Sequence, residues 1–341
     1  MDYVRLGDTG LHVSPLCLGC MMFGAWGNTD HEDSVRVIHA AIDAGINFLD
    51  TADVYSGGES EEIVGKALKG RRDDVILATK FHGPTGSGPN DRGNSRHHIF
   101  RAVEDSLRRL DIDYIDLYQV HRPDPLTNVE ETLSALTDLV RQGKVRYIGS
   151  TTYPAAEIVE AQWAAARRGL ERFVSEQPPY SILVRDIERA MLPAAAQYEM
   201  GVIVWSPLAG GWLSGKYRPG EPMPKEGRAA RMPPRFDPGL EGNKQKYAVI
   251  EALAPLAEKE GISLVELAIA WTLEHPAVTS AIIGPRTMEQ LEGQLKAPGI
   301  KLSAETLDAI DEIVPPGVTL NRPDNGYEPV WLEPAHRRRP R

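Results

Sequence analysis

The sequence predicts an α/β fold, a (β/α)₈ TIM barrel, and two observations support this expectation. Short apolar runs alternate with longer amphipathic stretches eight times along the 341 residues. Most links between these segments are short, as is usual where parallel strands are connected through helices. Because barrels of this kind often reach this length as one domain, we expect residues 1–341 to form a single domain.

The predicted strands are apolar runs that are rich in β-branched residues and bounded by turn residues or charged stretches. Such runs are typical of strands that are buried on both faces in a parallel sheet. The eight runs lie near Ser14–Gly19, Ile46–Thr51, Val75–Lys80, Ile115–His121, Val145–Ser150, Phe173–Gln177, Gly201–Ser206 and Thr279–Gly284.

The predicted helices carry apolar residues at helical spacing. Val103, Leu107 and Leu110, for example, recur on one face, while charged residues fill the opposite face. The amphipathic stretches are Asp30–Ala44, Ser60–Leu68, Ser95–Leu110, Val129–Arg141, Pro154–Arg168, Arg185–Tyr198, Lys244–Glu260 with Leu264–Glu274, and Met288–Leu295.

Three segments lie outside this repeat. Tyr3–Leu6 and Leu11–Val13 flank a Gly-Asp-Thr-Gly turn, which predicts a β-hairpin that caps the bottom of the barrel. A long loop, Tyr217–Gly242, follows the seventh predicted strand, and loops of this length are often functional. A proline-rich tail, Pro315–Arg341, follows a last helix near Ala304–Ile313.

The composition excludes several classes of protein. Hydrophobic residues make up 42% and charged residues 25% of the chain, which is ordinary for a globular protein. The net charge of −10 argues against nucleic acid as a main partner. Neither an apolar run of about 18 residues nor a signal-peptide pattern is present, so we expect a cytoplasmic protein without a membrane partner. No His/Cys cluster has metal-ligand spacing, so we expect no metal.

Polar side chains close three consecutive predicted strands. Asp50, Lys80 and His121 stand at these strand ends, and Tyr55 follows Asp50 by five residues. The C-terminal strand ends of a parallel α/β fold carry the functional site. Each residue alone could be a cap or a solvated strand end, but no packing requirement demands all four. An acid, an amine, an imidazole and a phenol together could move a proton to or from a carbonyl oxygen.

The chain resembles a known family, the aldo-keto reductases, over nearly its whole length. It is most similar to the bacterial branch that is related to voltage-gated potassium channel β-subunits. The stretches that carry the resemblance are Asn47–Tyr55, Ala78–Lys80, Asp116–His121, Glu176–Ser181 and Trp205–Gly211.

The resemblance implies NADPH-dependent reduction of a small-molecule carbonyl compound to an alcohol. Tyr55 would be the general acid, and Lys80 beside it would favour the phenolate. Asp50 would hold Lys80, and His121 would orient the carbonyl and stabilise the developing oxyanion.

The resemblance also implies how NADPH is held. No G-x-G-x-x-G fingerprint follows any predicted strand, and in this family the cofactor lies extended over the barrel top. Gln177 would bind the carboxamide, Trp205 would stack on the nicotinamide, and Arg286 would bind the 2′-phosphate. The full expected set is Gly19, Met21, Asp50, Thr151, Thr152, Gln177, Trp205, Ser206, Pro207, Leu208, Gly210, Leu213, Gly215, Lys216, Arg218, Gly284, Arg286, Gln290 and Gln294.

This chain departs from the family pattern at the cofactor site. Thr152 stands where the family usually has an asparagine, so one contact to the carboxamide is in doubt. Gln294 replaces an asparagine at the adenine end. The long loop carries Arg218, Lys225, Arg228, Arg231 and Arg235, and we expect it to order over the anionic cofactor.

The substrate is the least determined feature. We expect Trp26, His82 and Trp212 to line its pocket beside Tyr55, which suits an apolar or aromatic carbonyl compound or a sugar aldehyde. Assembly into a homo-oligomer is left open by the sequence.

Two alternative functions remain. Gly210–Tyr217 is close to a phosphate-binding P-loop, but the Ser/Thr ligand for Mg²⁺ is missing and Trp212 and Leu213 would occupy the cradle. The channel-subunit relatives suggest an NADPH-binding regulatory or redox-sensing subunit with low turnover. Cys17 and Cys20 form a C-x-x-C pair on a predicted strand, and we expect them to be small buried residues rather than a redox pair.

Overall fold

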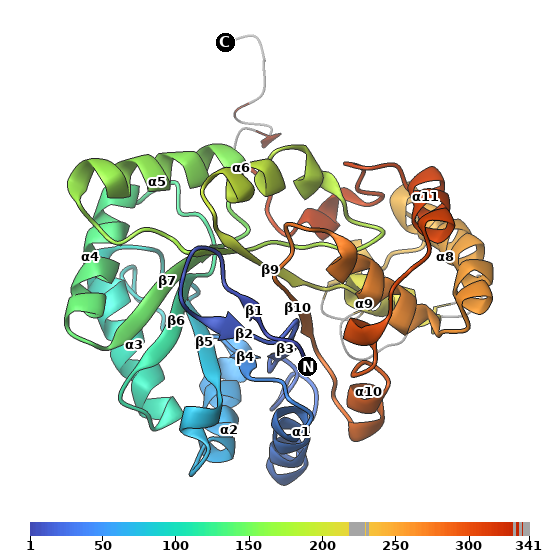
Figure 1. The fold of residues 1–341 in the computed structure, drawn as a ribbon. Coiled ribbons are helices and arrows are strands. Elements are labelled where there is room, and N and C mark those ends of the chain that lie inside the picture. Colours follow the sequence, from blue (N-terminus) through green and yellow to red (C-terminus); the bar gives the residue numbers. More distant parts are fainter. Residues whose placement is uncertain (218–228, 230–231, 330–331, 334–335, 337–341) are drawn as a thin grey trace.

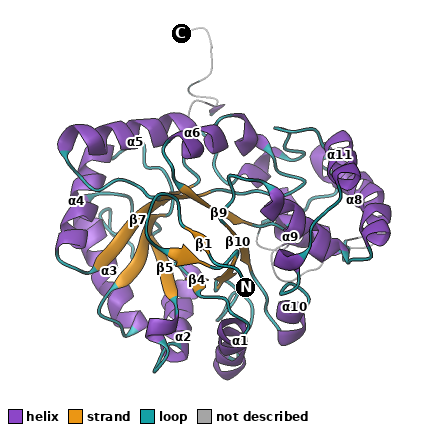
Figure 2. Cartoon of the chain, in the orientation of Figure 1, coloured by secondary structure: helices purple, strands orange, loops and turns teal. Residues whose placement is uncertain are grey.

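A computed structural model describes residues 1–217, 229, 232–329, 332–333 and 336. Eight parallel strands form a closed barrel with helices around it (Figures 1 and 2), which confirms the predicted fold class. Around the barrel the order is β10-β3-β4-β5-β6-β7-β8-β9, so neighbours in sequence are neighbours in the sheet. The strands are β3 (Leu16–Gly19), β4 (Phe48–Asp50), β5 (Ile76–Phe81), β6 (Ile115–Val120), β7 (Val145–Thr151), β8 (Ser175–Gln177), β9 (Gly201–Trp205) and β10 (Ser280–Ile283).

The helices lie around the outside of the barrel (Figure 2), and their buried apolar residues pack against the strands. Several begin directly after a polar residue that caps them: the Ser95 side chain accepts a hydrogen bond from the His98 N–H, and Ser263 forms a capping box with Glu266. The helices are α1 (His31–Asp43), α2 (Glu59–Ala67), α3 (Arg96–Leu110), α4 (Val129–Arg141), α5 (Ala155–Arg168), α6 (Met191–Gln197), α8 (Glu241–Glu260), α9 (Leu264–Glu274), α10 (Met288–Glu292) and α11 (Ala304–Ile313).

Two predicted helices are shorter than expected, and one of them, α10, ends at Glu292 rather than at Leu295. The stretch Arg185–Tyr198 divides into a 3₁₀ turn, η3 (Asp186–Arg189), and α6. Pro193 explains the division, because its ring would clash with the carbonyl of residue 189 in a continuous helix. The proline is therefore placed in the first turn of α6, where it is tolerated.

The N-terminal hairpin closes the bottom of the barrel, as predicted. β1 (Val4–Arg5) pairs with β2 (His12–Val13) in antiparallel fashion. Leu6 and Val13 are fully buried and pack against the lower layer of barrel side chains, which includes Phe48 and Leu117. The hairpin therefore excludes water from the end of the barrel opposite the C-terminal strand ends.

The upper half of the barrel interior is polar. Side chains alternate between the two faces of each strand, so Phe48 and Asp50 of β4, and Leu117 and Gln119 of β6, share the inner face. Phe48 and Leu117 join the lower apolar layer, whereas Asp50 and Gln119 are joined by a hydrogen bond above it. The barrel thus builds an apolar floor under a polar site.

The segment after β9 and the C-terminal segment contact each other. Arg235 of η5 (Pro233–Arg235) pairs with the buried Asp324 of η7 (Arg322–Asn325) at 2.7 Å. The other basic residues of the long loop, Arg218, Lys225, Arg228 and Arg231, lie outside the described residues. In the part of the chain that is described, no helix is long and apolar enough to span a membrane.

Candidate active site

Asp50, Lys80 and Tyr55 form one hydrogen-bonded chain at the C-terminal end of the barrel. The Lys80 Nζ atom lies 2.5 Å from Asp50 Oδ1, 2.8 Å from the Thr51 carbonyl oxygen and 3.1 Å from Tyr55 Oη. Lys80 is fully buried and Asp50 is 3% exposed. Burial alone would lower the pKa of Lys80, but the Asp50 carboxylate and the Tyr55 phenol outweigh burial and raise it. Lys80 is therefore charged, and it places its charge beside the phenol oxygen.

His121 completes the group of four. It follows β6 directly, and its ring lies edge-on to the Tyr55 ring with 5.7 Å between centroids. Burial, followed by the positive charges of Arg122 and Lys80, lowers the pKa of His121 well below its ordinary value. At neutral pH the imidazole is neutral, and in this form one ring nitrogen can donate a hydrogen bond to an oxygen. The structure thus brings together the four residues that the sequence singled out.

Two glutamines hold the far side of the Asp50 carboxylate. Gln177 Nε2 donates to Asp50 Oδ2 at 2.8 Å, and Gln119 Nε2 donates to the same oxygen at 3.1 Å. The two amides also contact each other at 3.3 Å. The sequence analysis missed Gln119, although it lies two residues before His121 in the predicted strand Ile115–His121, and this spacing places both side chains on one face.

Arg122 and Glu176 are two further charged residues at this face that the sequence analysis missed. Arg122 Nη1 donates to the His121 carbonyl oxygen at 2.6 Å and to the hydroxyls of Thr151 and Thr152 at 3.3 Å each. Glu176 is fully buried and accepts hydrogen bonds from Ser150 Oγ at 2.5 Å and the Tyr153 N–H at 3.0 Å. Burial raises the pKa of Glu176 to about 7.

The backbone is strained directly after three of the strands. His82 (φ 141°), Thr152 (φ 59°) and Ser206 (φ 60°) follow the last residues of β5, β7 and β9. Non-glycine residues seldom adopt positive φ, and each such residue costs about 1–3 kcal/mol. Strain of this kind gathers at functional sites, where the surrounding structure fixes it.

The residues expected around the nicotinamide and pyrophosphate follow β7, β8 and β9. Trp205 ends β9 with a partly exposed ring, and the Arg235 guanidinium lies 5.5 Å from the ring centroid. Gly326 approaches the same ring so closely that a Cβ at this position would lie 2.6 Å from Trp205 Cζ2. The following turn holds Ser206, Pro207, Leu208, Gly210, Leu213, Gly215 and Lys216, while Gly19 and Met21 end and follow β3. Arg218 lies outside the described residues.

The residues expected at the adenosine end follow β10. The Arg286 side chain is exposed, and the backbone N–H of Arg286 donates to Gln290 Oε1 at 2.9 Å. Gln294 is 6% exposed, and its Oε1 atom has no hydrogen-bond partner among the described residues. Space is open where a side chain at Gly284 would begin. These features fit an adenine and a phosphate, since the free amide oxygen can accept a hydrogen bond from an amino group.

The residues expected to line the substrate pocket do not share one environment. Trp26 lies beside Tyr55, with ring centroids 5.9 Å apart, and His82 contacts Asn94 at 2.9 Å. Trp212 is fully buried, and its Nε1–H donates to the Arg235 carbonyl oxygen. Its ring packs against Tyr217, Phe236 and Tyr247. The expectation for Trp212 is therefore corrected: its ring belongs to an aromatic core that anchors the turn after β9.

The burial of Trp212 and Leu213 also excludes the phosphate-binding P-loop that the sequence of this turn resembles. Trp212 and Leu213 point into the core where a phosphate cradle would need open backbone. Cys17 and Cys20 are free and buried, and burial raises the pKa of both thiols. Among the described residues, no group of three or more potential ligands could hold a metal ion.

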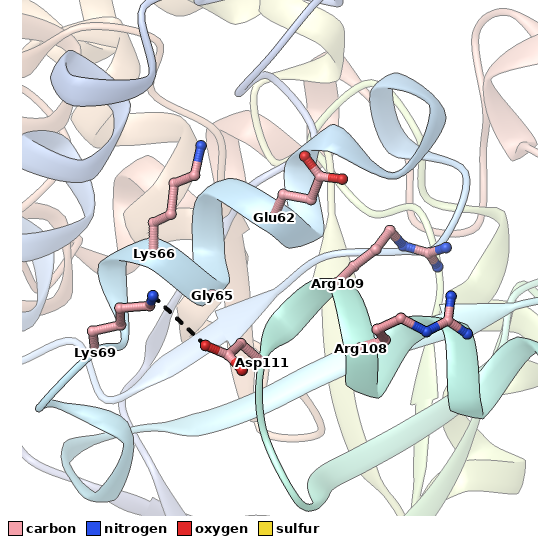
Figure 3. A pocket seen from close by; sticks show the side chains of 7 residues that line it. All are labelled: Glu62, Gly65, Lys66, Lys69, Arg108, Arg109 and Asp111. Carbon is pink, nitrogen blue, oxygen red and sulfur yellow. Dashed lines mark ion pairs between the residues drawn. The ribbon is translucent and has the colours of Figure 1, made fainter.

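A surface pocket of about 430 Å³ lies between α2 and α3, away from these residues (Figure 3). It is at the C-terminal ends of the two helices, which run antiparallel to the strands and therefore point to the barrel bottom. Its lining residues are Glu62, Gly65, Lys66, Lys69, Arg108, Arg109 and Asp111. Three of its cations form ion pairs: Lys69 with Asp111, Arg108 with Asp105, and Arg109 with Glu61. The fourth, Lys66, is hydrogen-bonded to the His31 ring. The pocket is therefore a solvated groove between helices.

A parallel barrel that gathers an acid, an amine, a phenol and an imidazole at its C-terminal face has the form of a barrel oxidoreductase. Residues 15–315 match the model of the aldo/keto reductase family. The chain belongs to this family, as the sequence resemblance predicted.

The relatives include both enzymes and channel subunits. The chain is 42% identical to the uncharacterized oxidoreductase YrpG of Bacillus subtilis (strain 168), over 92% of this chain and 96% of that protein. It is 38% identical to a probable voltage-gated potassium channel subunit beta of Oryza sativa subsp. japonica, over 92% of this chain and 97% of that protein. It is 36% identical to versiconal hemiacetal acetate reductase of Aspergillus parasiticus, over 92% of this chain and 96% of that protein. Family and relatives support an oxidoreductase that acts on carbonyl compounds.

Proposed function

We propose that this protein is an NADPH-dependent reductase of aldehydes or ketones, with Tyr55 as the general acid. The observation that carries the proposal is the buried chain from Asp50 through Lys80 to Tyr55, with 2.5 and 3.1 Å between the bonded atoms. A charged amine beside a phenol stabilises the phenolate that remains after the proton has left. A buried lysine held by a carboxylate has no evident structural purpose at the open end of a barrel.

NADPH, when bound, supplies the hydride that adds to the carbonyl carbon. Gln177, Trp205, Arg286 and Gln294 would hold it along the C-terminal face. The protein would then act on the oxygen of the substrate. Neutral His121 would donate a hydrogen bond to this oxygen and orient it, and Tyr55 would give its proton to the developing alkoxide.

The lysine and its partners would keep the acid ready for the next cycle. The charge of Lys80 stabilises the Tyr55 phenolate until a proton returns, and Asp50 keeps Lys80 at its place. Gln119 and Gln177 fix the second oxygen of Asp50, so the carboxylate cannot turn away. Preorganisation of this kind removes the cost of reorienting dipoles during the reaction.

The alternative is a regulatory subunit that binds NADPH and turns over slowly. The channel β-subunit relatives favour this alternative, since the similarity to one of them extends along 97% of that protein. One assay separates the two functions: oxidation of NADPH, followed by absorbance, with a panel of simple aldehydes and ketones. Steady turnover of at least one neutral aldehyde supports the reductase. Tight NADPH binding without turnover of any of them supports the regulatory subunit and refutes the reductase.

A further inference from the structure

Arg122 carries a charge that the proposed reaction does not use. It follows His121 at the end of β6 and is partly buried at the same face as the catalytic group. Its described hydrogen bonds all come from Nη1, and they go to one carbonyl oxygen and two threonine hydroxyls. These acceptors are neutral, so they hold the side chain without neutralising it.

The other internal arginines of the barrel are paired. Arg72 lies 2.6 Å from Asp116, Arg185 lies 2.9 Å from Glu188, and Arg235 lies 2.7 Å from Asp324. Arg122 has no carboxylate within 4.0 Å among the described residues. A partly buried cation without a counterion is costly, and proteins usually provide a partner for it.

The buried acid Glu176, whose charge acts on Arg122, is hydrogen-bonded elsewhere. Glu176 bonds to Ser150 Oγ and to the Tyr153 N–H, and burial raises its pKa to about 7. Burial lowers the pKa of Arg122, and the Tyr55 phenol and Glu176 act in the opposite direction. Because an arginine stays protonated in proteins, this face keeps an uncompensated positive charge next to Tyr55.

The free edge of the guanidinium is suited to an anion. Nε and Nη2 have no acceptor among the described residues, and an arginine binds a carboxylate or a phosphate through two parallel hydrogen bonds. The threonine contacts fix the guanidinium, so little side-chain entropy is lost on binding. A purely structural role for Arg122 would be to link the ends of β6 and β7 by hydrogen bonds. A neutral donor could form such a link, so this role does not explain why the residue is charged.

We propose that Arg122 binds an anionic substituent, a carboxylate or a phosphate, of the carbonyl substrate, so that the enzyme prefers acidic carbonyl compounds. This inference rests on the proposed function and names the substrate class of the same site. Arg122 would fix the anionic end of the substrate, while Tyr55 and His121 act on the carbonyl oxygen.

The test compares pairs of aldehydes that differ in one charge. The carboxylate pair is 4-carboxybenzaldehyde and its methyl ester, and the phosphate pair is glyceraldehyde 3-phosphate and glyceraldehyde. We expect the wild-type protein to prefer the charged member of at least one pair in kcat/KM. Arg122→Met should lower this preference by about 10–100-fold, the scale of a charge-assisted hydrogen bond. Arg122→Lys, which keeps the charge and loses the fork, should lie in between.

The control is Arg141→Met, which removes an exposed arginine of α4. Its preference should equal that of the wild type. NADPH affinity is measured for every variant by fluorescence titration. If Arg122→Met loses cofactor affinity and slows both members of each pair equally, Arg122 is a cofactor contact and the inference is overturned.

A measurement on the wild-type protein covers the case in which the variant does not fold. Benzoate and inorganic phosphate are added during reduction of a neutral aldehyde, and one of them should inhibit in competition with the aldehyde. No inhibition by either anion, or no preference in either pair, would overturn the role of Arg122 while the reductase function stands. Absence of turnover with the charged and the neutral aldehydes alike would refute the reductase function itself.

Discussion

Lys80 Nζ lies between Asp50 Oδ1 and Tyr55 Oη, 2.5 Å from the first and 3.1 Å from the second. The two nearest strands explain this arrangement: β4 ends at Asp50, and β5 presents Lys80 on the inner face one layer above Ala78. Because the strands are parallel and the apolar layer below is closed by the hairpin, the charged pair faces the open end. Tyr55 then enters from the 3₁₀ turn after β4, η1 (Tyr55–Gly58).

The first prediction concerns the acid. Tyr55→Phe should lose about 10²–10⁴-fold in kcat, the usual contribution of one acid-base group, and should keep its NADPH affinity. Initial rates of NADPH oxidation and a fluorescence titration measure the two quantities. Tyr114→Phe is the matched control, because Tyr114 stacks on Arg72 and Arg146 outside the site. Wild-type turnover in Tyr55→Phe would refute the assignment.

The second prediction concerns the choice of cofactor. Arg286 is exposed at the end of β10, where a 2′-phosphate could accept charge-assisted hydrogen bonds. Arg286→Ala should weaken NADPH binding by about tenfold or more, the effect of losing about 1.4 kcal/mol, and should leave NADH binding nearly unchanged. Titration with both cofactors tests this, with the exposed Lys301→Ala as the control. Equal losses for NADPH and NADH would show that Arg286 does not recognise the phosphate.

Asp50, Lys80 and His121 were predictable because the strand pattern fixes their geometry. Each of the three ends an apolar run, and the last residues of parallel strands lie together at the C-terminal face of the barrel. Gln119 was predictable in principle from the alternation along β6. Arg122 was not, because the direction of a side chain beyond a strand end depends on its tertiary partners, here the hydroxyls of Thr151 and Thr152.

Trp212 shows why pocket residues are harder to predict than strand ends. The turn after β9 bends through positive φ at Ala209, Gly210 and Gly211, so the direction of the following side chain cannot be taken from periodicity. The ring is instead directed into the core, where Phe236 and Tyr247 lie. These two partners follow in the chain by 24 residues or more, and only the folded structure brings them to Trp212.

The third prediction concerns the contact between the long loop and the C-terminal segment. Asp324 is 2% exposed and pairs with Arg235 at 2.7 Å and with Lys246 at 2.5 Å. Asp324→Asn would leave two inner cations without a counterion, so the free energy of unfolding should fall by about 3–5 kcal/mol. Urea denaturation measures this loss. Adding Lys246→Met should recover part of it, because one uncompensated charge is removed; additive losses would show that the charges are not coupled.

The last prediction concerns a buried acid, Asp53, two residues before Tyr55 in the sequence. Asp53 is 3% exposed, and neither of its carboxylate oxygens has a hydrogen-bond partner among the described residues. Burial, with a further contribution from Glu61, raises the pKa of Asp53 to about 8. In the unfolded chain an aspartate has a pKa of about 3.9. Between about pH 4 and pH 8 the folded protein therefore binds a proton at Asp53 that the unfolded chain has lost.

The sign of the pH effect follows from this difference. Stability falls with rising pH wherever the folded state holds more protons, so the Asp53 contribution should weaken the fold from about pH 4 to pH 8. An asparagine side chain at this position would resemble the protonated acid and stay neutral at every pH. Asp53→Asn should therefore exceed the wild type in free energy of unfolding by a margin that grows by about 1.4 kcal/mol per pH unit between pH 5 and pH 8 and levels off near pH 9.

Urea denaturation of both proteins at each pH unit from 5 to 9 gives the difference directly. Glu176 acts in the same direction, since burial raises its pKa to about 7, but it is present in both proteins and cancels in the difference. Asp113→Asn, at an exposed aspartate, is the matched control and should show no change with pH. A constant difference between Asp53→Asn and the wild type from pH 5 to pH 9 would mean that Asp53 is not protonated in the folded protein, and that its negative charge has a partner.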